Sequence, residues 1–116
     1  MNKYRNRKTH CLSGHLHDSK KEAGYCDVLL AMKKNGEIID YKTQVTMELL
    51  PGFVNSEGKK IRRITYTPDF VVYHEGQTEI IDVKGGNATK TQLWQLKWKW
   101  LQYHLRENKI YKFTII

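Results

Sequence analysis

The sequence is short of proline, of cysteine and of long apolar runs. Its 116 residues include two prolines and two cysteines, and the longest apolar run spans residues 28–32. A membrane-spanning helix needs about 20 apolar residues, so no transmembrane segment is expected. Residues 1–10 are basic and polar with no apolar stretch behind them, so no secretory signal is expected. Cys11 and Cys26 are therefore expected to be cytoplasmic thiols rather than a disulfide.

Acidic residues are also scarce relative to basic ones. Twelve Asp and Glu stand against twenty Lys and Arg, which leaves a formal net charge of +8. A small basic protein commonly binds a polyanion such as nucleic acid, although the same charge can serve solubility alone. Two basic clusters are the candidate phosphate contacts. Their members are Lys3, Arg5, Arg7, Lys8, Lys59, Lys60, Arg62 and Arg63.

The chain length allows one domain with one core. Hydrophobic residues make up 40% of the chain and charged residues 28%, both ordinary for a folded protein. The sequence contains no internal repeat and no low-complexity segment. We expect a basic arm and a short hairpin over residues 1–18, followed by a single domain over residues 19–116.

Local signals predict the first helix. Ser19 and Glu22 have the spacing of a capping box, in which the Glu side chain reaches back to the backbone N–H of the cap. Apolar residues follow at helical spacing, and Asn35-Gly36 is suited to a helix end. These signals predict a helix over residues 19–34. A Ser13-Gly14 turn predicts a short hairpin over residues 10–17 before it.

The rest of the chain predicts strands and one more helix. We expect one strand over residues 39–50, a loop to residue 60, and a second strand over 64–73 that Pro68 interrupts. A tight turn at residues 74–77 leads to a third strand over 78–84. A long helix over 89–107 and a strand over 111–116 complete the order α-β-β-β-α-β. The sequence therefore predicts an α/β fold.

Two carboxylates are expected to meet across the hairpin at residues 74–77. Asp69 lies about as far before the turn as Asp82 lies after it, so the two can sit opposite each other. Asp82 shares a strand face with Lys84. Paired carboxylates repel unless a positive charge intervenes, and a hard divalent cation takes such oxygen ligands. The alternative is a surface hairpin on which Asp82 and Lys84 form a weak exposed pair.

The same residues carry a resemblance to a known superfamily. Pro68-Asp69, followed after twelve residues by Asp82-Val83-Lys84, resembles the motif of the PD-(D/E)XK nucleases, and the element order resembles their core. Further segments resemble a family of small phage proteins, known only as a domain of unknown function and most similar to the Holliday-junction-resolvase branch. These segments are residues 3–6, 18–23, 50–53, 64–66 and 82–85.

This resemblance implies a restriction-endonuclease-like αβββαβ core with a mixed central sheet flanked by helices. It also implies a metal site in which Asp69, Asp82 and the Val83 carbonyl bind Mg²⁺, with Mn²⁺ expected to substitute. Lys84 would orient the attacking water, and Glu22 on the first helix would hold the metal or its water. The capping box is a rival explanation of Glu22 that needs no catalysis.

The last predicted helix adds another candidate catalytic residue. Trp94, Trp98 and Leu101 belong to a broad apolar arc, and Lys97 lies within that arc. Lys97 either extends its amine to solvent between the Trp rings or reaches Asp82 or a DNA phosphate. We interpret the Trp residues as core or dimer surface rather than as a base-stacking platform.

Cys11, His15, His17 and Cys26 are a possible zinc set. Their spacing matches no common zinc pattern, and Cys26 falls inside a predicted helix. The sequence therefore gives little support to a zinc site.

Together these observations predict a small Mg²⁺-dependent DNA endonuclease. The expected role is structure-specific cleavage, resembling Holliday junction resolution, in phage recombination or replication in the bacterial cytoplasm. The core elements leave no room for a separate sequence-reading module, and branched DNA with two-fold symmetry suits a homodimer. The rivals are a non-catalytic nucleic-acid-binding module on the same scaffold and a small basic phage accessory protein.

Overall fold

The computed structural model describes residues 8–12, 14–17, 19–84 and 90–116. Helix α1 covers Lys20–Lys34 and begins at Ser19, whose hydroxyl accepts a hydrogen bond from the Glu22 N–H at 3.2 Å. It ends at Asn35, and the following Gly36 has a φ of +76°. The predicted helix and both of its ends are thus confirmed to within a residue.

Four strands form the central sheet. They are β3 (Asp40–Thr43), β8 (Phe70–His74), β9 (Gln77–Asp82) and β10 (Tyr111–Ile115), in the spatial order β10-β9-β8-β3. Strand β10 runs parallel to β9, whereas the β9–β8 and β8–β3 pairs are antiparallel. Helix α2 (Gln92–His104) makes the crossover from β9 to β10, and Thr91 caps its start. The expected α/β fold with a mixed sheet is confirmed.

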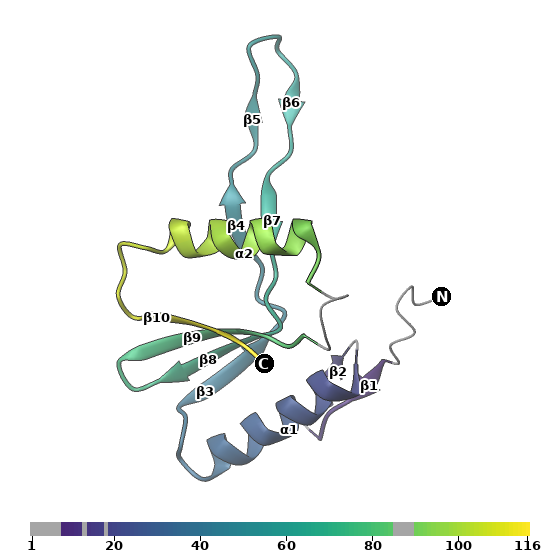
Figure 1. Ribbon diagram of the computed structural model, residues 1–116, viewed down its shortest axis with the longest axis vertical. Helices are drawn as coiled ribbons and strands as arrows, with labels where there is room; N and C mark the ends of the chain where they lie inside the picture. The colour runs from purple at the N-terminus through teal and green to yellow at the C-terminus, as the bar shows by residue number, and fades with distance from the viewer. Residues whose placement is uncertain (1–7, 13, 18, 85–89) are drawn as a thin grey trace.

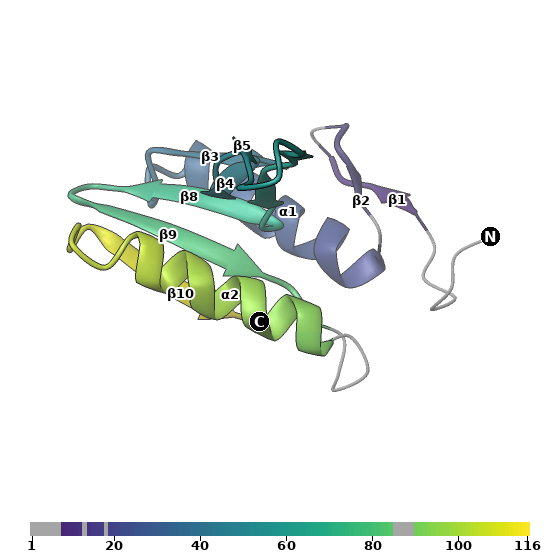
Figure 2. The ribbon, with the colours of Figure 1, turned by 90° about the horizontal axis from the view of Figure 1, so that it is seen from above.

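The two helices cover opposite faces of this sheet (Figures 1 and 2). Neighbouring residues of β9 point to opposite faces, so Ile81 packs in the cluster of α1 and Ile80 in the cluster of α2. Phe70 is fully buried on the α1 side, and Trp98 is buried on the α2 side. Asp82 shares the parity of Ile80 and therefore belongs to the α2 side.

The two longest predicted strands are each divided in the structure. The expected strand 39–50 is β3 and β4 (Met47–Leu50), and the expected strand 64–73 is β7 (Ile64–Tyr66) and β8. Strands β4 and β7 pair with each other in a separate two-stranded sheet. Gln44, with a φ of +57°, breaks the first strand, and Pro68 breaks the second as predicted. A left-handed residue and a residue without an N–H both interrupt a ladder.

The expected loop before residue 60 contains a further hairpin. Strands β5 (Phe53–Val54) and β6 (Lys60–Ile61) pair antiparallel and extend the β4–β7 pair into an arm that projects from the body (Figure 1). The Asn55 side chain accepts hydrogen bonds from the backbone N–H groups of Glu57 and Lys59 at the tip. Two-residue strands show no alternation, so the sequence pattern did not reveal them.

A small hairpin precedes α1, as predicted. Strands β1 (Thr9–His10) and β2 (Leu16–His17) pair antiparallel and lie beside the first half of the helix (Figure 1). Ser13, part of the predicted turn, lies outside the described residues, and Gly14 has a φ of +88°. Within the described part of the chain, neither helix has the length and apolar character needed to cross a membrane.

Candidate functional site

Asp69 and Asp82 lie side by side where β8 begins and β9 ends, and hydrogen bonds from backbone N–H groups orient both carboxylates. The register pairs Phe70 with Ile81, so the next pair along the ladder is Asp69 and Asp82. The Asp69 N–H donates to Oδ1 of Asp82 at 2.9 Å, and the Val83 N–H donates to Oδ2 of Asp69 at 2.8 Å. Each carboxylate is thus bound by a backbone N–H from the opposite strand. The predicted juxtaposition of the two aspartates is present.

Two aromatic side chains also bind the Asp82 carboxylate. The Tyr66 hydroxyl donates to Oδ2 of Asp82, and the Trp94 indole N–H donates to the same oxygen at 2.5 Å. The indole nitrogen also lies 3.0 Å from the Tyr66 hydroxyl oxygen. The sequence assigned no role to Tyr66 and treated Trp94 as core or dimer surface. The sequence feature that could have predicted the contact between Trp94 and Asp82 is the position of Trp94 in the first turn of the helix that follows the strand of Asp82.

Lys84 brings a positive charge to this carboxylate. Its Nζ lies 3.9 Å from Oδ2 of Asp82 and 4.4 Å from the centre of the Trp94 ring. The Lys84 side chain is 14% exposed, so solvent screens its charge only in part. Lys21 on α1 donates from its amine to the Lys84 carbonyl at 2.8 Å, which ties the start of the helix to the end of β9.

Asp82 and Glu79 lie on the same strand, and their environments shift their pKa values in opposite directions. Burial raises the pKa of Asp82, although the Trp94 hydrogen bond, the Lys84 charge and the Asp69 N–H work against that rise. Burial would also raise the pKa of Glu79, but hydrogen bonds from Thr114 and His74 outweigh it and hold the pKa below its ordinary value. Burial therefore disfavours the ionised form of Asp82, whereas hydrogen bonds favour the ionised form of Glu79.

The other two predicted catalytic side chains lie on the two helices. Glu22 is buried on α1, and its Oε1 is 3.0 Å from Nδ1 of His17. Lys97 is half-buried on α2, one turn beyond Trp94 and on the same side of the sheet as Asp82. Among the residues that the structure describes, Lys97 makes no ion pair. The catalytic roles of both side chains stay predictions.

The predicted phosphate contacts divide into two sets. Lys59, Lys60, Arg62 and Arg63 are exposed on the β5–β6 arm, and only Arg63 has an acidic neighbour, Glu48 at 3.7 Å, among the described residues. Lys8 is exposed next to β1. The other predicted members of the basic N-terminal arm, Lys3, Arg5 and Arg7, lie outside the described residues.

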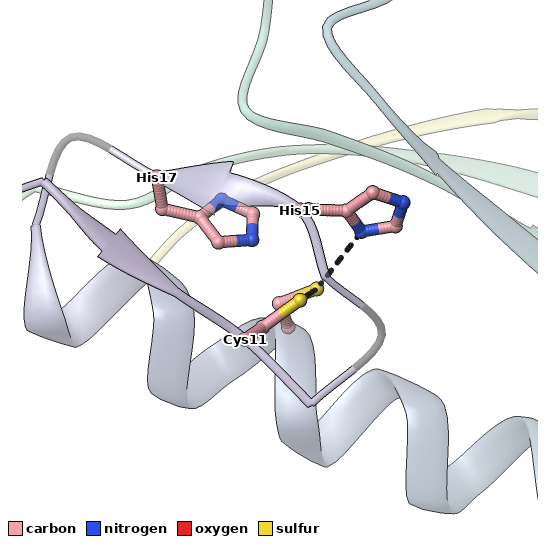
Figure 3. A group of neighbouring side chains, drawn as sticks. Cys11, His15 and His17 are labelled. Carbon is pink, nitrogen blue, oxygen red and sulfur yellow. Dashed lines mark hydrogen bonds between the residues drawn. The ribbon is translucent and has the colours of Figure 1, made fainter.

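A second group of candidate ligands lies on the α1 side of the sheet. Cys11, His15, His17 and Cys26 each offer one ligand atom, and these four atoms lie within 4.8 Å of one another. Figure 3 shows the first three of these residues. Among the residues that the structure describes, these four form the group of three or more His, Cys, Asp or Glu side chains whose ligand atoms are close enough to hold one metal ion. Spacing along the chain did not reveal that these four side chains lie together, because the packing of the hairpin on the helix brings them into proximity.

Comparison with known proteins gives a family but no activity. No curated protein and no solved structure matches the chain. One family model, described as a protein of unknown function (DUF1064), matches residues 1–114. Because this match covers nearly the whole chain, the protein belongs to the DUF1064 family.

Proposed function

We propose that the protein is a Mg²⁺-dependent DNA endonuclease with a restriction-endonuclease-like core, related to the PD-(D/E)XK nucleases. The observation that carries the proposal is the pair of hydrogen-bonded aspartates, Asp69 and Asp82, with Lys84 beside them at the end of β9. A carboxylate pair with one buried member, Asp82, next to a lysine contributes little to folding and much to phosphoryl chemistry. The order α1, three core strands, α2 and β10 agrees with this proposal.

The side chains present fit a hard divalent cation. Two carboxylates and the Val83 backbone carbonyl offer only oxygen, the ligand that Mg²⁺ prefers. A carboxylate has about four acceptor positions, and the N–H of Asp69, the Tyr66 hydroxyl and the Trp94 indole occupy three on Asp82. One position is left for a metal ion. The burial of Asp82 also supports a cation at this position, because a cation would offset the unfavourable free energy of burying an ionised carboxylate.

The residues around Asp82 would divide the work of hydrolysis. Bound Mg²⁺ would neutralise charge on the phosphate and lower the pKa of an attacking water. Lys84 supplies a fixed positive charge where negative charge develops on the phosphate oxygens. Tyr66 and Trp94 hold the Asp82 carboxylate in one orientation, so little reorganisation is needed during the reaction.

Branched DNA of the Holliday-junction type is the proposed substrate, in phage recombination or replication in the bacterial cytoplasm. The exposed basic residues of the β5–β6 arm are suited to backbone phosphates, which give affinity without reading sequence. A homodimer would present two sites to the two-fold axis of a junction. Leu93, Leu96 and Tyr103 are 61%, 57% and 63% exposed on the outer side of α2 and are candidates for its contact surface.

A non-catalytic nucleic-acid-binding module is the second candidate. The observation in its favour is that three protein donors and Lys84 already surround Asp82. A carboxylate bound in this way can be a structural group. The two candidates differ in whether any metal supports cleavage.

The deciding experiment incubates the protein with linear, flapped and four-way DNA in the presence of Mg²⁺ or Mn²⁺. We expect cleavage, strongest on the four-way substrate, and none from Asp82→Asn. The variant should bind DNA as tightly as the wild type or more tightly, since it removes a negative charge facing phosphate. Asp40→Asn, the same change at a surface ion pair with Lys33, is the matched control and should retain cleavage. DNA binding without cleavage under every metal condition would favour the binding module.

A further inference from the structure

Two thiols and two imidazoles converge between the N-terminal hairpin and α1. Cys11 follows β1, His15 precedes β2 and His17 ends it, as Figure 3 shows for these three residues. Cys26 lies on α1. Their four potential ligand atoms lie within 4.8 Å of one another. We propose that these four residues bind one Zn²⁺ ion in a tetrahedral Cys₂His₂ site, separate from the aspartates of the proposed nuclease site.

The spacing of the ligand atoms is close to what zinc requires. Zinc bonds of about 2.3 Å to sulfur and 2.0 Å to nitrogen place tetrahedral ligand atoms about 3.3 to 3.8 Å apart. The Nδ1 of His15 lies 3.4 Å from Sγ of Cys26, inside that range. The two sulfur atoms are 2.8 Å apart and would separate by about 1 Å on coordination.

His17 presents a nitrogen that is suited to a metal. Its Nδ1 lies 3.0 Å from Oε1 of Glu22, so Nδ1 carries the proton and donates to this carboxylate. The remaining nitrogen, Nε2, is buried and makes no hydrogen bond of ordinary geometry to the described residues, although the Cys11 side chain interacts with this imidazole. A buried polar atom without a well-formed hydrogen bond is costly, and coordination would remove that cost. A carboxylate on the far nitrogen is also the usual support of a zinc-bound histidine.

The chemistry of the donor set favours zinc over a hard cation. Two sulfur and two nitrogen ligands in a tetrahedral arrangement are typical of Zn²⁺, whereas Mg²⁺ takes oxygen. Each thiol loses its proton on binding, so two protons are released and the two thiolates neutralise the ion. A site without net charge is compatible with the burial of Cys11, His17 and Cys26.

Four protein ligands leave no open coordination position, so this zinc would be structural. Strands β1 and β2 have two residues each, and a hairpin of that size is marginal by itself. The ion would cross-link the hairpin to α1. It would also hold the first turn of α1, from which Lys21 reaches the carbonyl of Lys84.

The first test measures metal and thiols in the wild-type protein. We expect about one zinc per chain by elemental analysis, and cobalt substitution should give the visible absorption of a tetrahedral thiolate site. Bound zinc should protect both cysteines from alkylation until a strong chelator removes it. Failure to retain zinc, together with absence of the cobalt–thiolate absorption, would refute the site. An intact mass two hydrogens lighter would instead identify a Cys11–Cys26 disulfide and would equally overturn the proposal.

Variants then assign the ligands. Cys26→Ser should eliminate the cobalt–thiolate signal or weaken zinc binding at least a hundredfold. In the wild-type protein, removal of zinc by a chelator should lower the melting temperature by about 5 °C or more. His104→Asn, at an exposed histidine of α2, is the matched control and should bind metal normally. Asp82→Asn should retain its zinc whether or not the protein is a nuclease, which keeps the two proposals separable. Normal zinc affinity in Cys26→Ser would contradict the proposal.

Discussion

The two faces of the central sheet carry side chains with different metal-binding chemistry. On the α2 side, Asp69 and Asp82 offer oxygen, and Tyr66, Trp94 and Lys84 surround the second of them. On the α1 side, the group around His17 offers sulfur and nitrogen. The first set is suited to a hard cation that exchanges easily, and the second to a softer ion that stays bound.

The first turn of α1 connects the two regions. Glu22 is hydrogen-bonded to His17, and Lys21 donates to the Lys84 carbonyl. The His17 ring lies 5.6 Å from the ring of Phe70, which is the neighbour of Asp69 along the chain. The comparison therefore predicts that most substitutions affect one region alone, whereas a change in this turn affects both.

After the loss of cleavage expected for Asp82→Asn, the largest effect is expected from removing the positive charge beside Asp82. Lys84→Met keeps an apolar stem against Trp94 and deletes the charge that we propose acts on the phosphate. Cleavage should fall at least about a hundredfold, while the zinc content is unchanged. Single-turnover cleavage rates and elemental analysis measure the two outcomes. Lys34→Met, on the exposed last turn of α1, is the control. A loss of zinc in Lys84→Met would contradict the expectation that the two regions respond independently to substitution.

Neutralising the β5–β6 arm should weaken the proposed DNA binding and leave both proposed metal sites intact. Changing Lys59, Lys60, Arg62 and Arg63 to Gln should lower affinity tenfold or more for every DNA substrate alike. The slope of log affinity against log salt should decrease by about 0.9 for each phosphate that the variant no longer neutralises. Binding titrations over a range of salt concentrations measure this slope. If it does not change, the arm is only a solvated surface.

Glu22→Gln tests the connection between the regions. The change keeps the shape of the side chain but removes the charge that supports His17. Zinc affinity should decrease about 10- to 100-fold, and cleavage at saturating zinc should also decrease because Glu22 is a predicted site residue. Competition with a chelator and cleavage assays report the two effects separately. Glu37→Gln, at an exposed position, is the control. Unchanged cleavage at saturating zinc would remove Glu22 from the predicted catalytic set.

Lys97→Met should have a smaller effect on the α2 side. The substitution preserves the half-buried stem and deletes an amine that lies on the same helix as Trp94. A tenfold loss of cleavage, or about 1.4 kcal/mol of transition-state stabilisation, is expected if the amine acts at the site. The melting temperature should change little. A normal rate in the folded variant would identify Lys97 as a structural residue that extends to solvent.

The smallest effect is expected on the stability of the fold at low pH, to which Glu79 contributes. Its lowered pKa means that ionised Glu79 stabilises the fold above the ordinary value of 4.5, and this stabilisation is lost as the pH falls through the lowered pKa. Asp82 has a raised pKa, so its contribution is present below the ordinary value of 3.8 and is lost as the pH rises. Urea unfolding between about pH 3 and pH 6 should therefore show less loss of stability on acidification in Glu79→Gln than in the wild type. An equal loss would assign the acid sensitivity to another group.

Local signals were enough for much of the fold. The cap at Ser19 and the Asn35-Gly36 end delimited α1, and the turn at residues 74–77 joined β8 to β9. That turn also determined that Asp69 faces Asp82, because the register of a hairpin follows from its turn. These features depend on residues a few positions apart, which is the range over which periodicity, caps and turns act.

Tertiary structure decided the rest. The two long predicted strands are divided into a β3–β8 pair and a β4–β7 pair. The division requires that Gln44 interrupts one strand and Pro68 interrupts its neighbour between the same two pairs, which the pattern of a single strand does not reveal. Trp94 reaches Asp82 only because α2 packs across the sheet after the crossover. Cys11 and Cys26 meet only because the hairpin folds back on α1. Contacts between distant segments form where the elements pack, and spacing along the chain carries little information about them.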